Sequence, residues 1–175
     1  MISRRRPLAI RVVRMRPAGT TRLAKVAEPL LDAPADLGAL RRYLTDRRNI
    51  FLLASVGSRT VGFLRGTSLG QVHTRRPQMF LYEVAVAPAC RRRGVGRALV
   101  EHLLAYCRAR RFDEVFVFTD PGNRPAVALY RGTGAITETP RDRMFVYPLR
   151  KRAGGGRAPA GRRRGQPLPQ RRSNR

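Results

Sequence analysis

Residues 84–99 read VAVAPACRRRGVGRAL, and this stretch determines the fold that we expect for the chain. An apolar strand runs into a basic turn that contains two glycines, and an amphipathic helix follows the turn. Such a turn directs backbone N–H groups, the positive end of a helix dipole and arginine side chains toward one point. The sequence therefore predicts a phosphate or pyrophosphate site here, and with it a phosphorylated cofactor.

Length and composition fit one globular domain. The chain has 175 residues, of which 42% are hydrophobic, enough for a single domain with a core. No apolar run approaches the roughly 18 residues of a membrane span, and the arginine-rich start does not resemble a secretory signal. Two cysteines provide no disulfide framework and indicate a reducing cytoplasm. With only two histidines besides, the sequence indicates no structural metal site.

The net charge of +26 comes in large part from the end of the chain. Residues 150–175 carry ten basic side chains and no acidic one, without periodicity, so we expect a disordered basic tail. That tail is either without function or makes non-specific nucleic-acid contacts. Residues 1–149 form the domain and keep a charge of +16, which favours anionic ligands. Nucleic-acid binding as the main function is disfavoured, because the sequence shows no recognition helix and no basic strands interleaved with aromatic residues.

Hydrophobic periodicity predicts an α+β fold with a mixed, mostly antiparallel central sheet flanked by helices. The stretch 115–118 is apolar on both faces, so we expect it to be a central strand covered on both sides. The expected strands are residues 8–14, 50–56, 60–69, 79–86, 115–118 and 144–147, and the expected helices lie around residues 23–30, 37–44, 99–111 and 125–130.

Two motifs carry a resemblance to a known family. The first is Arg91-Arg-Arg-Gly94-Val-Gly96 after a strand, and the second is Asn123-Arg-Pro-Ala126-Val-Ala-Leu129-Tyr130, with one predicted strand between them. On these motifs residues 8–149 resemble the GCN5-related N-acetyltransferases (GNAT). The resemblance implies the GNAT fold, acetyl-CoA as cofactor, and acetyl transfer to a primary amine by direct attack in a ternary complex. Many GNAT enzymes are dimers, so a homodimer is expected by analogy.

Four shorter pieces resemble aminoglycoside 3-N-acetyltransferases of type I within that family. They are FLYEVAV at residues 80–86, FVFTD at 116–120, PAVALY at 125–130 and MFVY at 144–147. This narrower resemblance implies the 3-amino group of an aminoglycoside as the acceptor; the alternative is another amine, such as a protein N-terminus or a polyamine. One feature departs from it, because a substrate with several ammonium groups favours an acidic cleft and this domain is strongly basic.

Glu83 and Tyr130 are the candidate catalytic residues. Acetyl transfer requires that the amine lose a proton and that the departing thiolate gain one. A period of two places Glu83 on one face with Met79, Leu81 and Ala85, where desolvation would make its carboxylate a stronger base. The family fold has a bulge in this strand, and a bulge would change which face Glu83 occupies. The alternative is an exposed Glu on the polar face of a sheet. The resemblance assigns the base to Glu83 and the acid to Tyr130, whose alternative role is that of a core aromatic.

The cofactor is expected to lie along the end of the strand at 79–86, the glycine turn and the start of the last helix. Each part has a structural alternative. The turn could be a solvated, arginine-rich helix start, Val84 and Val86 could be ordinary core residues, and Asn123 could be a helix cap. The candidate cofactor-binding residues are Val84, Ala85, Val86, Arg91, Arg92, Arg93, Gly94, Val95, Gly96, Arg97, Ala98, Asn123 and Ala126.

Carboxylates are the candidate ligands of the ammonium groups of the substrate. Each of them has a structural alternative as a turn, capping or surface residue. His73, His102, Cys90 and Cys107 are expected to be loop, surface, turn and core residues respectively, and not catalysts. The candidate substrate-binding residues are Asp32, Asp36, Glu83, Asp120 and Asp142.

Overall fold

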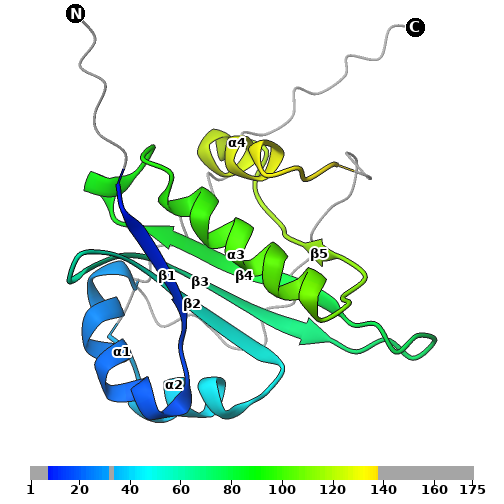
Figure 1. Cartoon of the computed structure of the whole chain (residues 1–175), viewed down its shortest axis with the longest axis horizontal. Coiled ribbons are helices and arrows are strands. Elements are labelled where there is room, and N and C mark those ends of the chain that lie inside the picture. The colour runs from blue at the N-terminus through cyan, green and yellow to red at the C-terminus, as the bar shows by residue number, and fades with distance from the viewer. Residues whose placement is uncertain (1–7, 32–33, 138–175) are drawn as a thin grey trace, which may run out of the picture.

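The computed structural model describes residues 8–31 and 34–137, without the side chains of Val26 and Pro29. Figure 1 shows a twisted sheet with one long helix across one face and two short helices against the other. The helices are α1 (Thr20–Ala27), α2 (Leu37–Thr45), α3 (Val95–Ala109) and α4 (Arg124–Gly132), with short 3-10 turns at Pro17–Gly19, Glu28–Leu30 and Pro88–Cys90. The strands are β1 (Ile10–Arg14), β2 (Asn49–Val56), β3 (Arg59–Leu69), β4 (Gln78–Val86) and β5 (Val115–Phe116).

The five strands form one sheet in the order β1-β2-β3-β4-β5. The pairs β1–β2, β2–β3 and β3–β4 are antiparallel, and a two-residue turn joins β2 to β3, whereas β5 runs parallel to β4 after the crossover through α3. The predicted mixed, mostly antiparallel sheet flanked by helices is therefore confirmed. The predicted strand at 144–147 and the tail at 150–175 lie outside the described residues.

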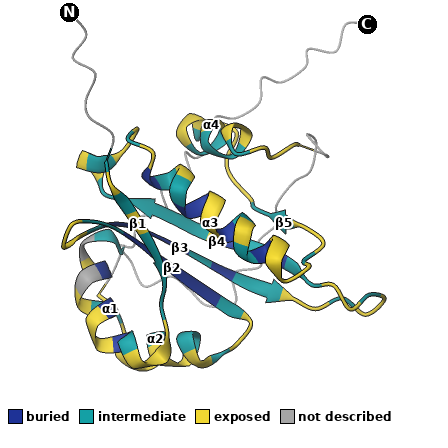
Figure 2. Cartoon of the chain, viewed as in Figure 1, coloured by how far each residue is buried: buried dark blue, intermediate teal, exposed yellow. Residues whose placement is uncertain are grey.

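Two apolar clusters hold the layers together, one on each face of the sheet (Figure 2). On one face, α3 buries a stripe made by Val95, Leu99, Leu103 and Cys107 against the strands. Each fully buried leucine of that stripe contributes roughly 1.5–3 kcal/mol to the free energy of folding. On the other face, α1 and α2 cover β1 to β3 around the buried ring of Phe63. Among the described residues, every helix is too short or too polar to span a bilayer.

The strand expected at residues 115–118 is shorter and more exposed than predicted. β5 has two residues, both half-buried, and it lies at the edge of the described sheet. Phe118 is 65% exposed. The prediction of a central strand covered on both sides is thus wrong for the described part of the chain. Its α3 side is packed, but the apolar cluster on the opposite face extends over β1 to β3 and not over β5.

A one-residue bulge in β4 changes which side chains face α3. Arg65 of β3 lies opposite Glu83, whereas the next residue, Gly66, lies opposite Leu81, so Tyr82 has no partner in the register. Before the bulge, Leu81 packs in the cluster under α3; after it, Val84 does so. The period-two prediction that Glu83 shares a face with Met79 and Leu81 is therefore wrong, because the extra residue shifts the alternation. Glu83 instead lies on the opposite face with Ala85, which packs against the α1 and α2 cluster.

Gly66 and Tyr43 hold the strands together next to this bulge. A Cβ added at Gly66 would lie 2.8 Å from the Phe80 carbonyl oxygen and 3.1 Å from the Met79 sulfur. The absence of a side chain therefore permits the close approach of β3 and β4. The Tyr43 hydroxyl of α2 reaches the carbonyl oxygens of Gly66, at 2.8 Å, and Ile50, at 3.2 Å. Burial raises the pKa of Tyr43, so this donor keeps its proton at neutral pH.

A Gly66→Ala variant should lose about 1–3 kcal/mol of unfolding free energy, because its Cβ would clash with backbone that has little freedom to move. Gly70→Ala is the matched control, since a Cβ at Gly70 meets nothing within 4 Å. Urea unfolding followed by circular dichroism measures both. Equal stability of the two variants would contradict the close approach of β3 and β4.

Candidate functional site

The basic glycine turn forms the start of α3. Gly94 caps the helix with a φ of +86°, which favours glycine, and Arg92 has a φ of +59°. No side chain caps this helix end and no acidic residue lies in its first turn. The N–H groups of Val95, Gly96 and Arg97 therefore face outward without an intrahelical acceptor, which suits an anionic ligand.

Four arginines near this helix start differ in their bonding partners and in their exposure. The Arg91 guanidinium donates to the Val86 carbonyl oxygen at 3.2 Å, which ties the turn to the end of β4. Arg97 pairs with Glu101, one helical turn on, at 3.3 Å. Arg92 is exposed and Arg93 is half-buried. The charge of these groups adds to the helix dipole at the point where the backbone donors lie.

Beyond its first residues β4 runs without β5 beside it. The two strands pair only at Met79 with Val115 and at Phe80 with Phe116. On the other side, the Ala87 N–H donates to the Val61 carbonyl, and this register directs the backbone groups of Ala85 toward β3. The backbone groups of Val84 and Val86 then point the opposite way, toward the space beyond the end of β5. The Val86 carbonyl already accepts from Arg91, so the groups left for an extended ligand are the N–H of Val86 and the N–H and C=O of Val84.

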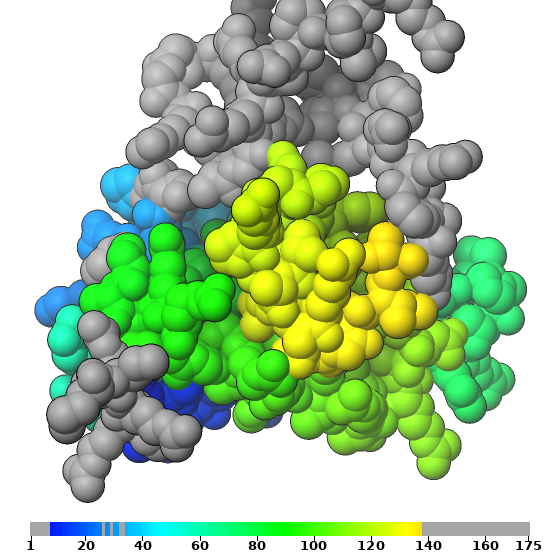
Figure 3. Space-filling view, turned by 90° about the horizontal axis from the view of Figure 1, so that it is seen from above, coloured from blue at the N-terminus to red at the C-terminus, as the bar shows by residue number. Residues whose placement is uncertain are grey.

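The chain brings α4 against the start of α3 at this same end of β4. Figures 1 and 3 show the two helices side by side. A Cβ at Gly96 would lie 3.2 Å from Leu129 and 3.9 Å from Val86, so these residues meet at one point. Gly96 has no positive φ and serves this close packing of helices. Asn123 caps α4, since its side-chain oxygen accepts from the N–H of Ala126 at 3.3 Å.

Tyr130 lies on α4 and packs, half-buried, against the cluster under α3 that includes Val84 and Val86. Burial raises the pKa of its phenol above the ordinary value of 10.0. The phenol therefore carries its proton through the neutral range and is able to donate it. Both readings of Tyr130 from the sequence, a partly buried aromatic and a proton donor, are compatible with this position.

Glu83 lies on the other face of the sheet and is paired. Its carboxylate accepts from the Arg65 guanidinium at 2.6 Å, and the two side chains are 30% and 36% exposed. The expectation of a desolvated carboxylate is therefore wrong, because the bulge turns Glu83 away from the core under α3. Arg65 is not among the residues predicted from the sequence. The pattern that could have indicated it is a single charged residue inside an apolar stretch, 18 residues before Glu83.

The remaining acidic candidates are engaged in local structure or lie outside the described residues. The Asp36 carboxylate accepts from the N–H of Ala39 as the cap of α2. The Asp120 carboxylate accepts from the N–H of Gly122 at 2.6 Å in a turn. Asp32 and Asp142 are not among the described residues. Elsewhere, arginines pair with Asp46, Glu101 and Asp113, and Gln78 donates to Glu114.

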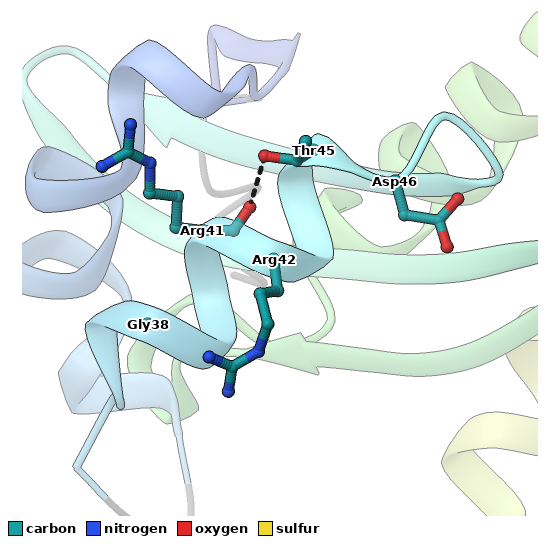
Figure 4. Close-up of a pocket in the computed structure, with 5 residues that line it drawn as sticks. All are labelled: Gly38, Arg41, Arg42, Thr45 and Asp46. Carbon is teal, nitrogen blue, oxygen red and sulfur yellow. Dashed lines mark hydrogen bonds between the residues drawn. The ribbon is translucent and has the colours of Figure 1, made fainter.

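Two shallow hollows lie on the α1 and α2 side, away from these residues. One, of about 550 Å³, is lined by Gly38, Arg41, Arg42, Thr45 and Asp46. Figure 4 shows the arginine side chains pointing to opposite sides of α2 and the Thr45 hydroxyl donating to the Arg41 carbonyl. The other, of about 460 Å³, lies between the Pro17–Gly19 turn, α1 and α2. Neither hollow contains a predicted catalytic or cofactor-binding residue.

Cysteines and histidines take the structural roles that the sequence predicts. Cys107 is buried under α3, and burial raises the pKa of its thiol to about 11. Cys90 is half-buried in the turn Pro88–Cys90, and His73 and His102 are exposed. In residues 8–31 and 34–137, no three His, Cys, Asp or Glu side chains gather as metal ligands would.

Comparison with known proteins identifies a family and a set of folds. Residues 18–135 match the profile described as the acetyltransferase (GNAT) family. The chain is 31% identical over 94 residues to N-acetyltransferase 8B of Rattus norvegicus, which covers 54% of this chain and 42% of that protein. The chain therefore spans less than half the length of this curated relative.

Two solved structures from uncultured soil metagenomic samples share the fold over nearly their whole length. The aminoglycoside acetyltransferase HMB0005 is 26% identical with a TM-score of 0.72, covering 82% of this chain and 100% of that one. The aminoglycoside acetyltransferase meta-AAC0020, in complex with sisomicin, is 21% identical with a TM-score of 0.74, covering 81% and 97%. The second likeness is one of fold alone.

At pH 8, iodoacetamide should modify Cys90 in the native protein and leave Cys107 unmodified, because the thiolate reacts and burial keeps Cys107 protonated. Since the folded pKa of Cys107 lies above the ordinary 9.0, its contribution to stability is present below pH 9 and is lost as the pH rises through 11. Peptide mapping by mass spectrometry measures the labelling, with protein in denaturant as the control in which both react. Equal labelling of the native protein would contradict the burial of Cys107.

Proposed function

The chain belongs to the acetyltransferase (GNAT) family, and we propose that it acetylates the 3-amino group of an aminoglycoside. Acetyl-CoA is the donor that this family uses, which confirms the cofactor that the sequence predicts. One observation carries the proposal. The uncapped start of α3 follows the end of β4 that β5 does not pair, and the bulge of this same strand turns Glu83 to the face opposite α3.

The residues at this end of the molecule fit the cofactor. In the proposal, the outward N–H groups at the start of α3 and the arginines around it hold the diphosphate. The backbone groups of Val84 and the N–H of Val86 pair with the amides of the pantetheine arm, in the manner of an added strand, while the Val86 carbonyl keeps its bond from Arg91. Asn123 and Ala126 contribute by fixing the start of α4, and Gly96 by allowing α4 to pack closely. Ala85 acts only through the strand, since its backbone groups are directed toward β3.

Bound acetyl-CoA supplies an acetyl group that is activated as a thioester. The amine nitrogen forms a C–N bond to the acetyl carbon as the C–S bond breaks. Glu83 takes the proton that the ammonium must lose, and the Tyr130 phenol gives a proton to the sulfur. Arg65 holds the Glu83 carboxylate in a fixed orientation through the 2.6 Å contact, so it is a positioning residue. Each group on this path lies on an element with a packed face, which keeps the geometry fixed.

Two observations support an aminoglycoside as the acceptor. The four sequence pieces at residues 80–86, 116–120, 125–130 and 144–147 resemble those of 3-N-acetyltransferases, and the first three include β4, β5 and α4. The aminoglycoside acetyltransferase HMB0005, at 26% identity, shares the fold over its whole length. Asp120 is proposed to meet a further ammonium group, since it ends the segment that follows β5.

A thiol-release assay across an amine panel tests the proposal. The panel contains gentamicin-type aminoglycosides, spermidine and a peptide with a free N-terminus, and mass spectrometry and NMR locate the acetyl group. We expect acetylation at the 3-amino group, and we expect Glu83→Gln to lose at least about 10²-fold in kcat because the base is removed. Release of coenzyme A with spermidine or the peptide alone would overturn the aminoglycoside and leave an acetyltransferase for another amine.

A Gly94→Asp variant should raise the Kd for acetyl-CoA at least about tenfold, or 1.4 kcal/mol, because a carboxylate would face the diphosphate. Gly57→Asp is the matched control: Gly57 also has a positive φ, of +57°, but it lies in the β2–β3 hairpin with nothing within 4 Å. Because both variants place a side chain at a positive φ, the difference between their Kd values, measured by calorimetric titration, reports the effect of the charge at the start of α3. An equal Kd for the two variants would contradict the role of the turn.

Tyr130→Phe should lower kcat on the order of 10²-fold, because the phenol proton is lost while the ring still packs. The Kd for acetyl-CoA should stay within twofold of the parent protein. Tyr106→Phe serves as the control, since the Tyr106 ring lies between Arg14 and Arg110 and a phenylalanine ring preserves both contacts. Steady-state kinetics with calorimetric titration separates the two effects. Unchanged turnover would remove Tyr130 from the mechanism.

A further inference from the structure

Four aromatic side chains gather on the sheet face opposite α3, next to Glu83. Phe80 and Tyr82 come from β4, Phe116 from β5 and Phe118 from the residues just after it. None of the four belongs to either apolar cluster of the core. Tyr82 is 59% and Phe118 65% exposed. We call these four residues the aromatic surface; among the described residues, the cluster of α1 and α2 reaches β4 only at Ala85 and contains none of the four.

The rings of the aromatic surface are ordered against one another. Phe80 and Phe116 stack with centroids 5.2 Å apart and planes at 14°. Phe118 stands edge-on to both, at 5.9 Å, and Tyr82 stands edge-on to Phe80 at 5.7 Å. Two rings therefore stand edge-on to a stacked pair. Ring faces carry the negative part of the aromatic quadrupole, which attracts cations.

Arg65 shows that a cation is accepted at this place. Its guanidinium carbon lies 4.3 Å from the centroid of the Tyr82 ring, and its Nε bonds to Glu83. The bulge produces this arrangement, because it sets Tyr82 and Glu83 next to each other opposite the single residue Arg65. The base of the proposed reaction and the edge of the aromatic surface are thus adjacent.

Acidic side chains elsewhere in the described chain are already occupied. With Glu28 as the exception, each forms an ion pair with an arginine or accepts a hydrogen bond from a glutamine amide or a backbone N–H. The charge of Glu83 is itself balanced by Arg65. In the described part of the chain, an ammonium-bearing substrate therefore finds few carboxylates without a partner; Asp120, whose bond is from the N–H of Gly122, is the one proposed above for a further ammonium group. Aromatic faces attract cations without a carboxylate, and of the four rings Tyr82 and Phe118 are exposed, whereas Phe80 and Phe116 are half-buried and stacked on each other.

We infer that the aromatic surface is the acceptor site, and that Phe118 and its neighbours bind an amine carried on a ring. The inference rests on the proposed acetyl transfer and names how its acceptor is held. An ammonium group lies over a ring face by cation–π attraction. The C–H face of a saturated sugar ring packs on the neighbouring aromatic ring as apolar surface. The amine that reacts then points along β4 toward Glu83.

The test compares three variants with the parent protein, using a gentamicin-type aminoglycoside as the acceptor. Phe118→Leu keeps apolar bulk and removes the ring face, so we expect the acceptor KM to rise about fivefold or more. Phe118→Tyr keeps the face and should restore the KM to within twofold. Val72→Ala, at a fully exposed residue of the loop after β3, is the control and should change nothing. The KM for acetyl-CoA and the Tm should be unchanged in all three.

Two results would overturn the inference. An unchanged acceptor KM in Phe118→Leu would show that the ring face does not bind the substrate. A fall in Tm with both KM values unchanged would show that the aromatic surface is packed against another part of this chain. Neither result is the failure of the proposed function, which is the absence of transfer to any aminoglycoside. In the parent protein, NOE contacts between sugar-ring protons and phenylalanine ring protons provide a second measurement, which also supports the inference if present and contradicts it if absent.

Discussion

The bulge of β4, where Arg65 faces both Tyr82 and Glu83, is the constraint on which the site depends. Without the extra residue, Glu83 would point into the core under α3, among leucines and valines where a charge is costly. With it, Val84 and Val86 pack under α3 while Glu83 and Tyr82 face the opposite side. Gly66 and Tyr43 hold the neighbouring backbone close, so the bulge has a fixed place.

In the proposed reaction, the two faces of β4 have different tasks. On the α3 side, the uncapped helix start, α4 with Tyr130 and the part of β4 that β5 does not pair provide a place for an extended, phosphorylated donor. On the other side, Glu83 and the aromatic surface provide a place for an amine. The short pairing of β4 with β5, which ends at Phe80 and Phe116, leaves the space through which the two sides communicate. The domain is basic. In the proposal, arginines bind the anionic donor on one side of β4, and aromatic ring faces bind the cationic acceptor on the other.

Local signals in the sequence predict most of the fold. The hairpin of β2 and β3 and the apolar stripe of α3 follow from neighbouring residues, and both are found. The face of the sheet on which Glu83 lies cannot be predicted from neighbouring residues, because one extra residue reverses an alternation that looks regular in the sequence. Its partner Arg65 is 18 residues away and belongs to another strand. The shortness of β5 and the packing role of Gly96 depend on tertiary contacts, with β4 and with Leu129, that no local pattern encodes.

A crystal structure with coenzyme A bound at saturating concentration tests the central claim most directly. The account predicts the diphosphate against the N–H groups at the start of α3, the pantetheine arm along Val84 and Val86, and the sulfur in the space beyond β5, with Glu83 and Tyr130 on either side. A diphosphate bound anywhere else on the molecule, or a sulfur remote from the bulge, would contradict it.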